Sequence, residues 1–206
     1  MAKNNIFCFF GIDGAGKTTV IREVEKKLKE EGYDCETIYM GRAGNHKLPF
    51  IKKIMQIRSN KMLKKRKLNP KEVQRPIVDI YRKRSMLWVL GYYVEMWLRY
   101  LEAKKIAKKK IVLMDRYFYD GLVLAKKGVN FFKYITPKPA KSFLLYAPPE
   151  LILTRKQEAK KENIIEFYET AKKFSKFFGV KVIDNSLKLE KVVGEIYETI
   201  KKNIRT

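Results

Sequence analysis

Eight residues near the start of the chain have the types and the spacing of a loop that binds phosphate. They read Gly11-Ile12-Asp13-Gly14-Ala15-Gly16-Lys17-Thr18 and fit the pattern G-x-x-x-x-G-K-S/T at every fixed position. Glycines let the backbone curl so that successive N–H groups point at one anion. The Lys17 ammonium can then reach the β- and γ-phosphates, and the Thr18 hydroxyl can ligate Mg²⁺. The pattern predicts a site for a nucleoside triphosphate, ATP with Mg²⁺, formed by Gly11, Asp13, Gly14, Ala15, Gly16, Lys17, Thr18 and Thr19.

The residues on either side of this loop supply the elements that it needs. The apolar run 6–10 comes directly before it and reads as a buried strand. The residues after it read as a helix with Val20, Ile21, Val24 and Leu28 on one face. The N-terminus of that helix adds a partial positive charge at the loop. A glycine-rich turn with a chance lysine is the alternative, and the full match in a strand–loop–helix context favours the nucleotide site.

A second group of candidate residues follows another apolar run. Ile111-Val112-Leu113-Met114 precedes Asp115, which places this carboxylate at the carboxyl end of a predicted buried strand. Ligands of open α/β sheets bind at that edge. Asp115 can hold Mg²⁺ through water, and Arg116 beside it can bind a phosphate. An Asp-Arg pair that merely ends a strand at the surface is the alternative, and its occurrence together with a phosphate loop favours the functional interpretation.

Two further arginines are candidates for the same edge. Arg42 stands in a glycine-containing segment after the second predicted strand and can extend toward the ligand, although an ordinary loop arginine is an equal alternative. Arg155 begins a highly charged stretch that also holds Lys156 and Lys160, and a lid at about 154–163 is expected to close over transferring phosphates. A plain solvated helix face explains Lys160 better than it explains Arg155.

The elements around these residues predict the fold. Strand patterns at 5–10, 35–40, 111–115, 142–147 and 180–184 alternate with helical patterns at 17–31, 48–66, 71–109, 149–160, 163–178 and 188–203. Strands separated by helices indicate a parallel sheet with right-handed crossovers. We therefore expect a single α/β domain over residues 1–206, a three-layer α/β/α fold with a five-stranded parallel sheet.

The charge and apolar content of the chain indicate which kinds of binding partner to expect. The chain has 46 Lys and Arg against 22 Asp and Glu, a net charge of +24, which would attract nucleic acid or an anionic membrane. The lysines are spread along predicted helix faces and form no recognised RNA-binding signature, so an enzyme of small anionic substrates is the favoured interpretation. No apolar window is long enough to span a bilayer. Cys8 and Cys35 fall in predicted strands, which indicates buried, reduced thiols in a cytoplasmic protein.

Taken together, these motifs resemble those of the thymidylate kinase family of P-loop nucleoside-monophosphate kinases. The phosphate loop with Asp13 and the Asp115-Arg116-Tyr117 run are similar to two motifs of that family, and Arg42 and Arg155 fall where it has arginines. The resemblance implies a lid that closes over ATP and a homodimer. It also implies that Asp13 holds a sugar hydroxyl of the acceptor, while Arg42 and Arg116 hold phosphates.

The chain departs from that family mainly where the acceptor base would bind. The family's glutamate before the first glycine is replaced by Phe10, and its serines after Asp-Arg-Tyr are replaced by Asp120 and Gly121. Its arginine on the helix before the third strand has only Arg99 as a candidate, which is out of register. The motifs that handle ATP are intact, so the resemblance is to a divergent thymidylate-kinase-like branch.

Three reactions are compatible with these residues. In the first, the favoured one, ATP phosphorylates dTMP or a related nucleoside monophosphate, with Lys17, Arg116 and Arg155 spreading charge off the transferring group. In the second, the acceptor is the hydroxyl of a nucleoside or sugar, and Asp13 or Asp120 is the candidate base. In the third, nucleic acid stimulates an ATPase or is phosphorylated at its end.

Overall fold

The computed structural model describes residues 4–41, 86–125, 134–156 and 160–205. The chain divides into two compact units, one formed by residues 1–41 and 102–206 and the other by residues 42–101. The second unit contributes the first part of helix α4, Met86–Ile106, to the described residues. Within that part, Arg99 donates to the Glu95 carboxylate at 2.7 Å, one helical turn away. The first unit holds the sheet and all the residues that line the cavity discussed below.

Five parallel strands form the sheet, as the alternation of strand and helix patterns predicts. They are β1 Ile6–Phe10, β2 Cys35–Tyr39, β3 Ile111–Asp115, β4 Lys141–Tyr146 and β5 Lys181–Asp184. Their spatial order is β2-β3-β1-β4-β5. Phe9 pairs with Asp115 on one side of β1, and Phe10 pairs with Leu144 on the other. The phosphate loop and Asp115 therefore leave the sheet at the same edge, side by side.

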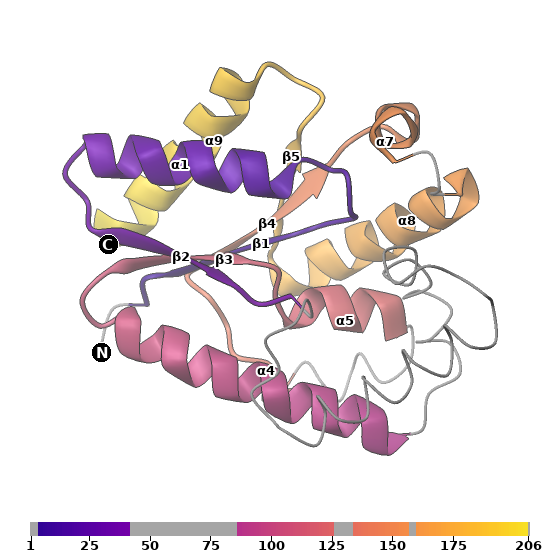
Figure 1. Cartoon of the computed structure of the whole chain (residues 1–206), viewed down its shortest axis with the longest axis horizontal. Coiled ribbons are helices and arrows are strands. Elements are labelled where there is room, and N and C mark those ends of the chain that lie inside the picture. Colours follow the sequence, from indigo (N-terminus) through magenta and orange to yellow (C-terminus); the bar gives the residue numbers. More distant parts are fainter. Residues whose placement is uncertain (1–3, 42–85, 126–133, 157–159, 206) are drawn as a thin grey trace, which may run out of the picture. The chain divides into compact units, whose positions relative to one another are not determined.

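Helices cover both faces of the sheet (Figure 1). On one face, α1 Lys17–Glu30 packs against α9 Leu189–Arg205 over a core that includes Phe7 and Phe9. On the other face, α5 Phe118–Ala125 packs against α8 Lys161–Phe178. There Phe10 meets Tyr119 and Phe174 edge to face. Because β1 is buried on both faces, all five of its side chains are apolar. The α/β fold with a five-stranded parallel sheet is thus confirmed.

The helix boundaries differ from the predicted ones in three places. Helix α7 covers Pro149–Arg155, shorter than the predicted 149–160, and Lys156 is its C-cap. Helix α5 follows the Asp-Arg-Tyr run, where the sequence pattern predicts no helix. In the predicted helix 71–109, the described part is helical from Met86 to Ile106. The predicted helix 48–66 lies outside the described residues.

Cys8 and Cys35 are both buried and free, as predicted. Burial is the main cause that raises the pKa of the Cys8 thiol well above its usual value. These thiols are therefore part of the core. Over the described ranges, no helix is both long enough and apolar enough to cross a membrane.

Candidate active site

The phosphate loop takes a backbone path that specific glycines permit. Gly11 has φ 146°, and a Cβ there would lie 2.7 Å from the Leu145 carbonyl oxygen, so a side chain would push the loop off β4. Gly16 begins helix α1 in the left-handed region, with φ 82°. A Cβ on Gly16 would lie 2.4 Å from the Asn185 amide nitrogen. The glycine spacing in the sequence thus matches one position where the neighbouring backbone leaves no room for a side chain, Gly11, and one where a left-handed φ favours glycine, Gly16.

Lys17 is buried at the start of α1, and its ammonium is held by the loop itself. Its Nζ donates to the carbonyl oxygens of Gly11 and Ile12 at 2.9 and 2.8 Å. It also lies 3.8 Å from the Asp13 carboxylate. Burial, together with the charge of Arg116, lowers the pKa of Lys17 to about 8, despite the neighbouring carboxylates. The ammonium is thus preorganised below the loop and loses its charge as the pH rises through about 8.

This lowered pKa predicts that triphosphate binding takes up protons. A bound polyphosphate favours the charged ammonium, so the pKa of Lys17 rises on binding. Affinity for ATP is then expected to fall as the pH rises through about 8. Calorimetric titrations with ATP at pH 8, in buffers of different ionisation enthalpy, should show net proton uptake. The uptake should vanish in Lys17→Met; proton release in the wild type would contradict this assignment.

Thr18 and Asp115 form a pair suited to Mg²⁺. The Thr18 hydroxyl donates to Asp115 Oδ2 at 3.1 Å, and Asp115 is 6% exposed. The other oxygen, Oδ1, is buried and has no hydrogen-bond partner among the described residues. A buried carboxylate oxygen without a donor favours a cation or its water shell. Within the same residues, no three acidic, histidine or cysteine side chains gather as metal ligands. Mg²⁺ is commonly held by one or two protein groups together with substrate phosphates, and Thr18 and Asp115 supply such a pair.

Replacing Asp115 should therefore weaken Mg²⁺ binding specifically. Asp115→Asn keeps the shape of the side chain but removes its charge. The Mg²⁺ concentration for half-maximal activity is expected to rise about tenfold or more, as for changes beside bound metals. A Mg²⁺ titration at fixed ATP measures it, and Asp34→Asn, at the opposite end of β2 and β3, is the matched control. An unchanged Mg²⁺ titration would remove Asp115 from the metal site.

Arg116 has an unusual backbone conformation that aims its side chain at the loop. Its φ is 73°, the one positive value among the described non-glycine residues. Its guanidinium donates to the Asp13 carboxylate and, at 3.4 Å, to Asp120 Oδ1. The Tyr39 side chain also lies close enough to favour the charged form of Arg116. Burial opposes its charge, but Asp120 and Asp13 outweigh burial and raise the pKa of Arg116. A fixed cation thus stands beside Lys17.

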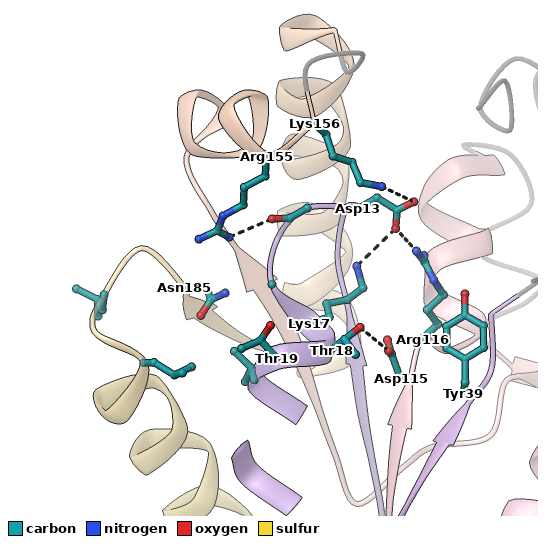
Figure 2. Close-up of a pocket in the computed structure, with 15 residues that line it drawn as sticks. Asp13, Lys17, Thr18, Thr19, Tyr39, Asp115, Arg116, Arg155, Lys156 and Asn185 are labelled. Carbon is teal, nitrogen blue, oxygen red and sulfur yellow. Dashed lines mark hydrogen bonds and ion pairs between the residues drawn. The ribbon is translucent and has the colours of Figure 1, made fainter. Parts of the chain in front are cut away.

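Asp13 lies at the centre of three cations (Figure 2). Its carboxylate contacts Arg116, Lys17 at 3.8 Å and Lys156 at 3.7 Å. Partial burial alone would raise the pKa of Asp13, but these three cations lower it. Asp13 is therefore a stably ionised carboxylate and a weak proton acceptor. Its side chain is 54% exposed, so a ligand can reach it.

The two basic residues at the end of α7 lie on different sides of the loop. The Arg155 guanidinium donates to the Gly14 carbonyl at 3.1 Å, on the side of Asn185. Lys156 extends to the other side, toward Asp13 and Arg116 (Figure 2). The predicted lid begins in this place, with α7 ending at Arg155 and α8 starting at Lys161. Both cations are therefore next to the site, and Lys156 is the one that faces the Asp13 side.

These residues line a cavity of about 550 Å³. Beyond the predicted residues, its lining includes Tyr39, Lys156, Asn185, Leu187 and Leu189. Asn185 donates to the Ala15 carbonyl at 2.6 Å and so fixes the loop to the end of β5. Sequence reasoning placed Lys156 in the predicted lid and assigned no side-chain role to the other four. Tyr39 and Asn185 could have been found as polar residues at the carboxyl end of a predicted strand.

The predicted site residues fall into three groups in the structure. Those around the cavity are Asp13, Gly14, Gly16, Lys17, Thr18, Thr19, Asp115, Arg116 and Arg155. Gly11, Ala15 and Asp120 belong to its supporting wall: Ala15 is fully buried, and Asp120 is 7% exposed and does not line the cavity. Arg42 lies outside the described residues.

Comparison with known proteins adds independent evidence. No protein-family model matches the chain. A probable thymidylate kinase of Archaeoglobus fulgidus is 27% identical over 203 residues, covering 92% of this chain and 91% of that protein. One from Sulfurisphaera tokodaii is 28% identical over 143 residues, covering 66% of this chain and 60% of that protein. An adenylyl-sulfate kinase of Halothermothrix orenii is 72% identical over 25 residues, only 12% of this chain and 14% of that protein.

The named relatives are all kinases, and the two long matches carry the name that the motifs suggest. The match across almost the whole chain agrees with the five-stranded parallel sheet and with the geometry of the loop. These two matches confirm the resemblance inferred from the sequence: the chain is similar to thymidylate kinases, a group of P-loop nucleotide kinases.

Proposed function

We propose that this protein transfers the γ-phosphoryl group of ATP to the phosphate of a nucleoside monophosphate, with dTMP as the first acceptor to test. The names of the two long relatives support dTMP. Mg²⁺ is proposed as the metal, held by Thr18 and Asp115. A homodimer and a cytoplasmic location stay predictions of the resemblance and of the sequence.

The observation that carries this proposal is the lack of a free general base on the described lining of the cavity. Asp13 and Asp115 are the acidic residues on that lining. Asp13 is occupied by three cations that lower its pKa, and Asp115 faces Thr18 and the proposed metal. An acceptor hydroxyl would need a base to take its proton. A phosphate monoester needs none, because its second pKa is about 6 and it is already an anion at neutral pH.

The chain's own residues then act mainly through position and charge. The loop amides and Lys17 hold the β- and γ-phosphates, and Arg116 faces the transferring group from the Asp13 side. Bound Mg²⁺ would supply further charge neutralisation at the γ-phosphate. The cations beside Asp13 are proposed to contact the incoming phosphates, and Asp13 is proposed to accept a hydrogen bond from the acceptor.

An acceptor panel tests the proposal. ADP formation from ATP and Mg²⁺ is measured with dTMP, dUMP, UMP, CMP, nucleosides, sugars and sugar phosphates. We expect turnover with dTMP or another nucleoside monophosphate. Turnover only with hydroxyl acceptors would overturn the proposal and restore the search for a base. Stimulation only by oligonucleotides, with a steep salt dependence, would favour the nucleic-acid reaction instead.

The two cations of α7 are expected to differ in their effects on turnover. Lys156→Ala removes the cation on the Asp13 side and should lower kcat about tenfold to a hundredfold, less than a fully enclosed donor because Lys156 is partly exposed. Arg155→Ala removes a cation beside Gly14 and Asn185 and should mainly raise the KM for ATP. Steady-state kinetics of both variants give the comparison. The reverse pattern would assign the transferring phosphoryl to Arg155.

A further inference from the structure

A buried carboxylate lies behind the cavity, where it contacts both the phosphate loop and Arg116. Asp120, in the first turn of α5, is 7% exposed. Its Oδ2 accepts from the Tyr117 amide at 3.1 Å, and its Oδ1 lies 3.4 Å from the Arg116 guanidinium. The backbone N–H of Gly11, the first glycine of the loop, also lies close enough to this carboxylate to favour its charged form. One side chain thus connects two segments that are about a hundred residues apart.

The packing around Asp120 keeps it in place. The Tyr117 hydroxyl donates to the Pro137 carbonyl at 2.7 Å, and Tyr119 packs edge to face against Phe10 and Phe174. Burial is the main cause that raises the pKa of Asp120, and the charges of Arg116 and Lys17 oppose it. The carboxylate is therefore costly to bury and depends on Arg116 as its counter-ion.

Arg116 accordingly has two carboxylate partners on opposite sides. Asp13 is exposed and lines the cavity, whereas Asp120 is buried and does not. A phosphate that enters the cavity competes with Asp13 for the guanidinium but cannot reach Asp120. The buried contact is thus the one that remains while the substrate is bound.

From this geometry we infer that Asp120 is a positioning residue, which holds Arg116 and the first amide of the phosphate loop in place when Asp13 gives way to substrate phosphate. The inference rests on the proposed function, because that function makes Arg116 a phosphate ligand. It also changes the role expected from the sequence, in which Asp120 is a base or an acceptor ligand. A residue that does not reach the cavity takes no proton from the acceptor.

A simpler role is possible for this side chain. An acid three residues after the N-cap residue of a helix commonly accepts from the N-cap N–H, as Asp120 does from Tyr117, the residue before α5. Such a cap would stabilise α5 without any effect on Arg116. The experiment has to separate these two roles.

A double-mutant cycle makes that separation. Asp120→Asn, Arg116→Ala and the double variant are compared in kcat/KM, on the acceptor that the wild-type protein uses, and in affinity for Mg·ATP. If Asp120 acts through Arg116, D120N should cost about tenfold or more in the wild-type background and little in the R116A background. Equal costs in both backgrounds would reduce Asp120 to a cap and overturn the inference.

Rescue by free guanidinium supplies a second readout. In R116A, the buried Asp120 carboxylate should bind added guanidinium ion and restore part of the activity. The same addition should do nothing in the double variant. Rescue that persists without Asp120 would contradict the inference. Asp34→Asn, a surface Asp→Asn change near the opposite sheet edge, controls for the substitution itself.

The two proposals fail in different ways. If the wild-type protein uses no nucleoside monophosphate, the proposed function fails. The double-mutant cycle is then measured as kcat/KM on the acceptor that the protein does use, or as affinity for Mg·ATP. If a nucleoside monophosphate is used but the effects of D120N and R116A are additive, the proposed function is supported and the positioning role of Asp120 is contradicted.

Discussion

Lys17→Ala is expected to lower kcat/KM by about a thousandfold or more, the loss typical of removing a preorganised charge from a transferring phosphoryl group. The ammonium is buried at the base of the loop and held by two carbonyl oxygens. Ala keeps the helix but leaves the β- and γ-phosphates without this cation. Steady-state kinetics, with fluorescence titration of a labelled ATP analogue, measure the effect on turnover and on binding.

The control lies on the same helix. Lys26 is an exposed lysine of α1 that pairs with Glu30, so Lys26→Ala removes an equal charge away from the cavity. It should change kcat/KM less than twofold, since single surface charges contribute little. If Lys17→Ala behaved like Lys26→Ala, the loop would not be the triphosphate site.

Arg116→Ala is expected to lower kcat by about a hundredfold to a thousandfold, with a smaller loss of ATP affinity. Arg116 faces the Asp13 side of the cavity, where the transferring group and the acceptor phosphate are proposed to meet. Both Arg and Ala have a Cβ, so the substitution leaves the backbone cost of φ 73° nearly unchanged. Arg116→Lys should recover only part of the activity, because an ammonium cannot bridge two carboxylates as a planar guanidinium does.

Two control measurements on Arg116→Ala separate a loss of catalysis from a loss of stability or of nucleotide binding. Thermal unfolding shows how much of the loss comes from leaving Asp120 without its counter-ion. Mg·ATP affinity shows whether the phosphate loop is intact. A variant that unfolds early but turns over normally at low temperature would remove Arg116 from catalysis and leave it a structural role.

The residues that the sequence proposes for the donor side lie together around one cavity because that side of the proposed site is local. The phosphate loop is one continuous segment whose glycines, lysine and threonine act through the backbone path of that same segment. Asp115 was proposed for a similar reason, because a carboxylate that ends a buried parallel strand lies at the carboxyl edge of the sheet, where ligands bind. Their pairing through Thr18 follows from the neighbouring positions of β1 and β3.

The remaining features depend on contacts between distant segments, which periodicity does not encode. The charge environment of Asp13 comes from Lys17, Arg116 and Lys156, on three different elements. Asp120 was a candidate for chemistry because it follows Arg116 closely, yet the turn into α5 buries it behind the cavity. The α5 helix itself was missed because its eight residues include Gly121 and carry no clear helical stripe. Arg155 and Lys156 are neighbours in sequence, and only the end of α7 directs them to opposite sides of the loop.

The most direct test of the central claim is the identity of the bond that the enzyme makes. Phosphorus NMR of a reaction with ATP, Mg²⁺, dTMP and the wild-type protein resolves it. We predict equal amounts of ADP and of a nucleoside diphosphate with a new phosphoanhydride. A new phosphate ester on a hydroxyl, or inorganic phosphate without any phosphorylated acceptor, would contradict the account.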